Sequence, residues 1–104
     1  MIDTILQAAG LPYWPGRCTD GEPPVTYGIY FDEVETDGPD GIVRIYYHDA
    51  MVELYEPAID EAAEAAVEQA ISSQGLTWTK SARNWLQNVQ RWQVVYEFSY
   101  IIKN

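Results

Sequence analysis

The chain has 104 residues, a hydrophobic content of 47% and a formal net charge of −10. This length fits one domain, and the apolar content excludes general disorder. Six Lys and Arg against 16 Asp and Glu argue against binding to nucleic-acid phosphates or to an anionic membrane surface. No apolar run approaches the roughly 18 residues that would cross a bilayer. The single cysteine, Cys18, excludes an internal disulfide.

The first segment, residues 2–9, is predicted to be a short helix, because its apolar residues recur at helical spacing and Gly10 is a natural stop. It lacks the basic flank of a signal peptide, so we expect an intracellular protein. Residues 11–16 form an apolar loop, and we expect Tyr13 and Trp14 to dock onto the body or onto a neighbouring subunit.

Three strand-like segments follow a polar connector. Residues 25–34 predict the first strand, and the Gly/Asp-rich residues 35–41 predict the tip of a hairpin. Residues 42–48 and 51–55 predict the next two strands, since apolar and polar residues alternate in both. Between them, residues 48–50 indicate a tight turn or a bulge.

An acidic helix is predicted over residues 58–73, with Pro57 at its first turn and Gly75 after its end. Its apolar positions recur at helical spacing and predict a buried stripe: Ile59, Ala63, Ala66, Val67, Ala70 and Ile71. Its carboxylates are Asp60, Glu61, Glu64 and Glu68. We favour the interpretation that these carboxylates form a solvated helix face over a metal site or an acid–base pair, because no His lies among them.

The chain closes on its clearest signal. Residues 76–80 predict a short strand, and residues 82–86 predict a single helical turn capped by Ser81. Residues 91–103 alternate apolar and polar side chains throughout, which favours a long strand lying inside the sheet. The fold class is therefore α+β: a mixed, mostly antiparallel sheet of four or five strands, with the main helix packed on one face and a short N-terminal helix.

The sequence offers little for catalysis. His48 is the only histidine, and pairing with Asp49 is disfavoured because adjacent strand residues point to opposite faces. Nothing local supports Cys18 as a nucleophile activated by His48. The acidic residues between 32 and 40 lack the spacing of an EF-hand, and no phosphate-binding or dinucleotide-binding loop is present. We expect no enzymatic activity, no cofactor and no metal site.

The aromatic residues are numerous for so small a core: four Trp, eight Tyr and two Phe. Two interpretations remain open. Either most belong to the core, with tyrosine hydroxyls at its rim, or some lie at a subunit interface, where Tyr and Trp are enriched. The residues expected at an interface are Tyr13, Trp14 and Trp85, with Asp32, Glu33, Glu35, Asp37 and Asp40 of the acidic hairpin.

The order of these segments resembles a family of small phage proteins. The segments that carry the resemblance are Gly10-Leu11-Pro12-Tyr13, Pro23-Pro24, Val52-Glu53-Leu54-Tyr55, Leu76-Thr77-Trp78-Thr79-Lys80, Trp85-Leu86-Gln87 and Trp92-Gln93-Val94-Val95-Tyr96-Glu97-Phe98. Over nearly its whole length the chain is similar to the tail-terminator or tail-completion proteins of long-tailed bacteriophages and prophages, which act in head–tail joining. The turn at residues 37–41 departs from the Ala-Asp-Asn-type turn expected there.

The resemblance implies a structural protein that forms a homo-oligomeric ring, commonly of six subunits, capping the tail tube and joining it to the head. Tail-tube and head-connector proteins would be its partners, without a membrane and without sequence-specific nucleic acid. It would act in the host cytoplasm during assembly and then in the tail or neck of the virion. A ring needs heterologous interfaces, and an acidic lumen would let DNA pass. We place the acidic residues 32–40 at the lumen or against a neighbouring ring.

Three alternatives stay open. The first is a head-closure or connector protein of the same neck. The second is an acidic DNA mimic, a monomer or dimer whose binding to a basic enzyme would fall steeply with salt. The third is a small hydrolase, which would require Cys18 close to His48.

Overall fold

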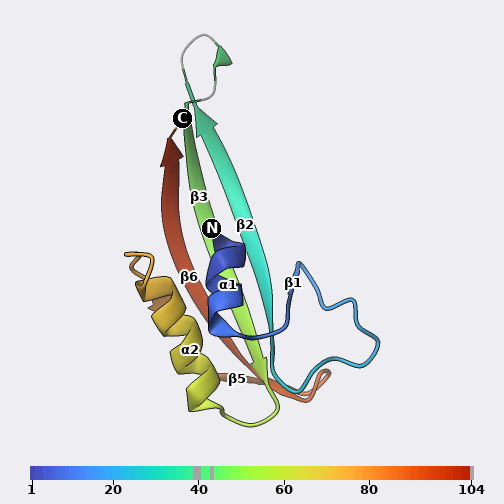
Figure 1. The fold of residues 1–104 in the computed structure, drawn as a ribbon. Helices are drawn as coiled ribbons and strands as arrows, with labels where there is room; N and C mark the ends of the chain where they lie inside the picture. The colour runs from blue at the N-terminus through green and yellow to red at the C-terminus, as the bar shows by residue number, and fades with distance from the viewer. Residues whose placement is uncertain (39–40, 43, 104) are drawn as a thin grey trace.

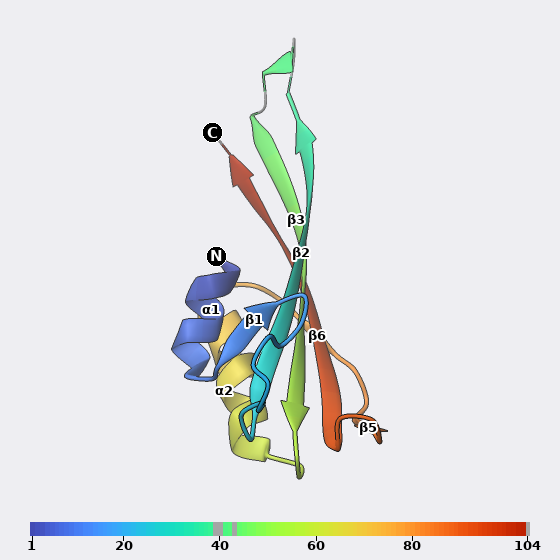
Figure 2. The same ribbon diagram turned by 90° about the vertical axis from the view of Figure 1, so that its right-hand side faces the viewer.

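The computed structural model describes residues 1–38, 41–42 and 44–103, and this part of the chain has an α+β fold. Two helices, α1 (Ile2–Ala9) and α2 (Glu61–Ser72), lie side by side on one face of a sheet (Figure 1, Figure 2). The described residues form six strands: β1 (Tyr13–Pro15), β2 (Tyr27–Asp37), β3 (Ile45–Glu56), β4 (Thr79–Lys80), β5 (Asn84–Leu86) and β6 (Arg91–Lys103). None of these helices is long and apolar enough to span a bilayer.

The sheet is mixed and mostly antiparallel, as predicted. Its order is β1-β2-β3-β6-β4, with β5 also paired to β6, and among the described pairs only β1 and β2 run parallel. β6 pairs with β3 along nearly its whole length, from Trp92 opposite Glu56 to Lys103 opposite Ile45. β5 and β4 pair with the other side of β6 at residues 91–93 and 96–97, so this part of the strand lies inside the sheet, as predicted. Beyond residue 97 no described residue pairs with that side.

The core fills the space between the two helices and one face of the sheet. Alternate residues of β3 and β6 point to this face, because the side chains of a strand alternate with a period of two. Each fully buried Leu, Ile or Val contributes about 1.5–3 kcal/mol, so this layer anchors both helices. The buried core residues include Ile2, Ile5, Leu6, Ala63, Val67, Ala70, Ile71, Val52, Leu54, Val94, Tyr96, Phe98 and Tyr100.

The helix ends follow local chemistry. α1 stops at Gly10, which adopts a left-handed conformation with φ of 73°. α2 begins three residues later than predicted, because Asp60 is its N-cap and its side chain accepts the Ala63 N–H at 3.1 Å. Ile59 therefore lies before the helix and is 49% exposed, so its assignment to the buried stripe was wrong.

Three local predictions about strands were also wrong. Residues 48–50 form neither a turn nor a bulge, because β3 pairs in unbroken register with β2 and β6 through this point. Residues 84–86 form β5 rather than a helical turn, and the Ser81 hydroxyl accepts the Val95 N–H at 2.9 Å instead of capping a helix. β1 was not predicted, since three residues beside a proline carry almost no periodic signal.

The molecule is elongated, with extents of 50 × 27 × 22 Å. The three long strands continue past the helices and form a projection, which is the upper half of Figure 1. We call this projection the arm and define it as residues 31–37 of β2, 45–49 of β3 and 99–103 of β6. The helices and the sheet beneath them form the body.

Candidate functional site

The arm exposes large apolar side chains on both faces. Because the helices stop below it, the strand alternation that builds the core continues here without a covering layer (Figure 2). The exposed fractions of five such residues lie between 39% and 55%: Phe31, Val34, Tyr47, Ile101 and Ile102. Exposed apolar side chains grouped in this way are typical of surfaces that contact another molecule.

Both edges of the arm are open. β1 pairs with β2 only at residues 28–30, and β4 pairs with β6 only at residues 96–97. Past these points no other described residue pairs with β2 or β6 on its outer side. An unpaired edge presents backbone N–H and C=O groups that another strand can bind.

The backbone groups that face outward can be assigned. On β2, Gly28 donates its N–H toward Pro12 and Tyr30 accepts the Gly16 N–H, so even-numbered residues point to the outer edge. On β6, the N–H and C=O of Val95 both bond to Ser81, so odd-numbered residues point outward. By alternation the free groups belong to Asp32, Val34 and Thr36 on β2, and to Ser99, Ile101 and Lys103 on β6.

A polar cluster joins the three strands at the base of the arm. His48 Nδ1 lies 2.9 Å from Asp32 Oδ1, and the Tyr100 hydroxyl donates to Asp32 Oδ2 at 3.0 Å. The rings of His48 and Tyr100 stack with centroids 4.3 Å apart and an interplanar angle of 11°. Burial, and then the neighbouring Asp32 carboxylate, raise the pKa of Tyr100 above its ordinary value. The cluster fixes the strands where the core ends.

This histidine has no nearby cysteine. Cys18 lies close to Tyr27, which pairs with Tyr55 at the other end of the sheet. His48 pairs with Val34, seven residues further along β2, a span of roughly 23 Å. The geometry that a Cys–His hydrolase needs is therefore missing.

Asp49, the sequence neighbour of His48, points to the opposite face of the sheet. There it accepts a hydrogen bond from Ser99 Oγ at 2.7 Å. The expectation that His48 and Asp49 do not pair is confirmed. The actual partner of His48, Asp32, was missed because the pair depends on strand register.

The aromatic residues predicted at an interface lie in different places. Tyr13 packs against the core, with its ring centroid 6.0 Å from that of Tyr30. Trp14 packs edge-on against Tyr27, also at 6.0 Å, so this segment docks onto the body. Trp85 remains 41% exposed at the end of the sheet opposite the arm.

The acidic residues of the hairpin belong mostly to β2 rather than to a loop. β2 continues to Asp37, three residues beyond the predicted end of the strand. Glu33, Glu35 and Asp37 are exposed on the face away from the helices, whereas Asp32 points to the other face. Asp40 lies outside the described residues.

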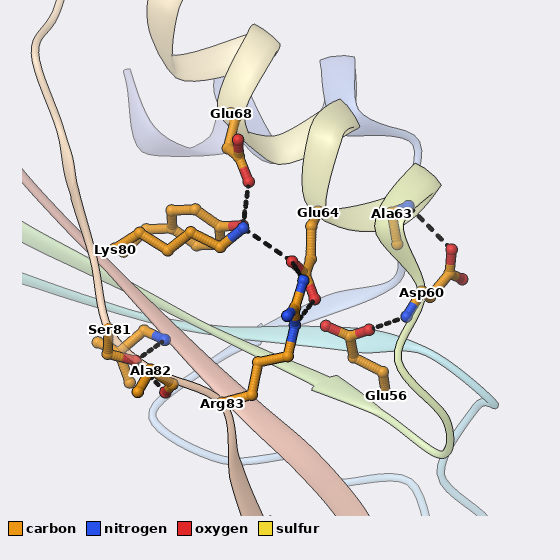
Figure 3. Close-up of polar contacts among 11 residues, drawn as sticks. Glu56, Asp60, Ala63, Glu64, Glu68, Lys80, Ser81, Ala82 and Arg83 are labelled. Carbon is orange, nitrogen blue, oxygen red and sulfur yellow. Dashed lines mark hydrogen bonds and ion pairs between the residues drawn. The ribbon is translucent and has the colours of Figure 1, made fainter.

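A second polar cluster lies under α2 (Figure 3). The Glu64 side chain is only 2% exposed, so the prediction of a solvated position was wrong for this residue. Arg83 donates to it from Nε at 2.9 Å and from Nη2 at 2.8 Å, and Lys80 Nζ donates at 2.8 Å. Lys80 also reaches Glu68, which accepts the Tyr96 hydroxyl at 2.7 Å. These bonds hold α2 to the edge of the sheet.

Glu56, at the end of β3, lies beside this cluster and is fully buried. Its Oε2 accepts the Asp60 N–H, and its Oε1 has no partner among the described residues. Burial first, and then the adjacent Glu64, raise the pKa of Glu56 to about 7, whereas the Arg83 guanidinium lowers the pKa of Glu64 to about 2. Both carboxyls are shielded from solvent, so this acid–base pair has no access to a substrate.

In the described ranges, no group of three or more His, Cys, Asp or Glu is arranged to hold a metal ion. Comparison of the sequence with protein-family models and with curated proteins gave no match. The feature of the described residues that stands out is the arm, where exposed apolar side chains and two open strand edges occur together.

Proposed function

We propose that this chain is a structural protein that assembles with copies of itself into a ring, as the resemblance to phage tail-terminator proteins implies. The observation that supports this proposal is the arm, in which exposed apolar side chains and two open strand edges occur together. A monomeric protein would normally cover or shorten such edges.

The two edges suit a contact that repeats around a ring. β2 and β6 run in the same direction, because each is antiparallel to β3. Pairing β6 of one subunit with β2 of the next therefore joins two different surfaces in parallel. Such a heterologous contact generates a closed ring when its rotation closes, whereas an isologous contact stops at a dimer.

Charge favours this pairing over pairing between two β2 edges. The β2 edge carries four carboxylates between residues 32 and 37, whereas residues 98–103 of β6 carry Lys103 and no acidic residue. Two β2 edges would repel each other, since like charges directly opposite are destabilising. Pairing of a β2 edge with the β6 edge of another copy avoids this repulsion, because residues 98–103 of β6 carry no carboxylate.

In this assembly the ring would cap the tail tube and meet the head connector, first in the host cytoplasm and then in the virion neck. Glu33, Glu35 and Asp37 would face the lumen or a neighbouring ring. The proposed role involves no enzymatic step, and the buried Glu56–Glu64 pair would serve the fold alone.

Light scattering across a concentration series, with negative-stain imaging, tests the proposal. We expect rings for the unmodified chain. Thr36→Pro and Ile101→Pro should each abolish them, because each removes an outward N–H without touching the bonds to β3. The matched controls Thr36→Ala and Ile101→Val keep the N–H and should still assemble. The proposal would be contradicted if the unmodified chain were a monomer at every concentration, or if both proline variants still formed rings.

A further inference from the structure

The sheet face opposite the helices has a groove of its own. A hollow of about 480 Å³ lies across β2, β3 and β6. Both described helices lie on the other face of the sheet (Figure 2). The side chains that point into this face come from alternate positions of each strand. They are Phe31, Glu33, Asp49, Met51, Glu53, Glu97 and Ser99.

Four of these residues are carboxylates, and none of the described residues lining the groove is Lys or Arg. Two of the carboxylates accept neutral hydrogen bonds: Glu53 from the Tyr55 hydroxyl at 2.9 Å, and Asp49 from Ser99. Their charges are therefore not compensated within the groove. Several like charges lining one hollow attract a cationic partner and raise its association rate.

The floor of the groove is apolar. Phe31 is 39% exposed there, and the half-buried Met51 lies directly opposite it on β3. A surface that only repelled DNA or bound small cations would not need an exposed phenyl ring. Methionine adapts its shape to different partners and is common at binding surfaces.

We infer that this groove binds a segment of another protein that presents an apolar side chain flanked by Lys or Arg. The apolar anchor fills the floor over Phe31 and Met51, and the cations meet the acidic rim. Buried anchors supply most of the affinity at such interfaces, and the charges supply orientation and rate. The groove is complete in one subunit, so binding does not depend on the ring.

The probe is a synthetic amphipathic helical peptide with leucines on one face and lysines on the other. Isothermal titration calorimetry should show binding that weakens as NaCl rises from about 50 to about 300 mM. A peptide with glutamates in place of the lysines should not bind. A peptide with alanines in place of the leucines should bind at least about tenfold more weakly, because it lacks the anchor.

Variants of the protein locate the binding. The double variant Glu53→Gln with Glu97→Gln removes two charges from the rim, and Met51→Ser removes part of the floor. Each should weaken binding about tenfold. The control Glu22→Gln with Glu61→Gln removes two negative charges outside the groove. Its affinity for the peptide should lie within about twofold of the wild-type affinity. Circular dichroism and thermal melts establish that each variant is folded.

Absence of binding, or equal binding by the groove variants and the control, would overturn the inference. Equal binding of the leucine and alanine peptides, with no effect of Met51→Ser, would also overturn it and indicate a purely electrostatic surface such as a DNA mimic presents. The proline variants of the arm should still bind the peptide. A loss of rings therefore tests the proposed assembly, and a loss of peptide binding tests the groove.

Discussion

The body and the arm are built from the same three strands, yet they differ in what covers them. In the body, Val94 and Tyr96 of β6 are fully buried beneath the helices. In the arm, Ile102 continues the same alternation and is 42% exposed. An alternating pattern therefore predicts a strand with an apolar face, and the position of the helices decides whether that face is buried in the core or stays exposed.

The polar clusters show the same contrast. In the body, Glu64 is buried and held by two cations, so its removal from water is compensated by charge-assisted bonds. In the arm, the cluster of Asp32, His48 and Tyr100 lies where the core ends and joins strands that have no helix above them. The body thus buries its polar cluster beneath α2, whereas the arm leaves apolar side chains exposed around its own cluster.

The largest expected effect comes from breaking the ion pairs of the body. The double variant Lys80→Met with Arg83→Met leaves Glu64 buried without a cation, so its unfolding free energy should fall by several times the change in the control. Urea denaturation measures this loss. The control Arg17→Met with Arg44→Met removes the same charge at exposed positions elsewhere and should change stability by less than about 0.5 kcal/mol. A similar loss in both variants would show that net charge, rather than the buried pair, is responsible.

The second effect concerns pH. Because the pKa of Glu56 is raised from 4.5 to about 7, its contribution to stability is present below pH 4.5 and is lost as pH rises through 7. The pH dependence of the contribution from Glu64 runs in the opposite direction. Because the pKa of Glu64 is lowered to about 2, its contribution to stability is present above pH 4.5 and is lost as pH falls through 2. We expect unfolding free energy to fall between pH 5 and pH 8 by on the order of 2–3 kcal/mol.

Glu56→Gln should remove this upper decline, since an amide can still accept the Asp60 N–H and carries no charge. Urea midpoints across the pH series compare the variant with wild type and with Glu61→Gln, a change at an exposed position. The variant should be more stable than wild type at pH 8. Parallel pH curves for all three proteins would exclude Glu56 as the titrating group.

The smallest effect comes from making the same substitution, Val to Thr, once in the body and once in the arm, at positions on the same face of the sheet. Val94→Thr buries a hydroxyl in the core and should cost about 1–3 kcal/mol. Val34→Thr, where the side chain is 46% exposed, should change stability by less than about 0.5 kcal/mol but weaken self-association. Thermal melts and light scattering measure the two outcomes. Equal destabilisation by both substitutions would mean that the arm is part of the folding core.

Local periodicity was enough to predict much of the fold. The alternation over residues 91–103 predicted β6, and helical spacing with Gly10 predicted α1. The apolar stripe predicted which face of α2 is buried, though not that Glu64 at its border is buried as well. These features follow from the period of one segment, which the sequence contains directly.

Only the tertiary structure determined the rest. The pairing of His48 with Asp32 requires the register of two strands, and the burial of Glu64 requires cations from a segment that follows α2 in the chain. The sequence determined the two helices, most of the length of the long strands and their apolar faces, but not the short strands β1 and β5. The tertiary structure decided which faces are covered, which edges stay open and which charges meet, because these depend on contacts between residues distant in the chain.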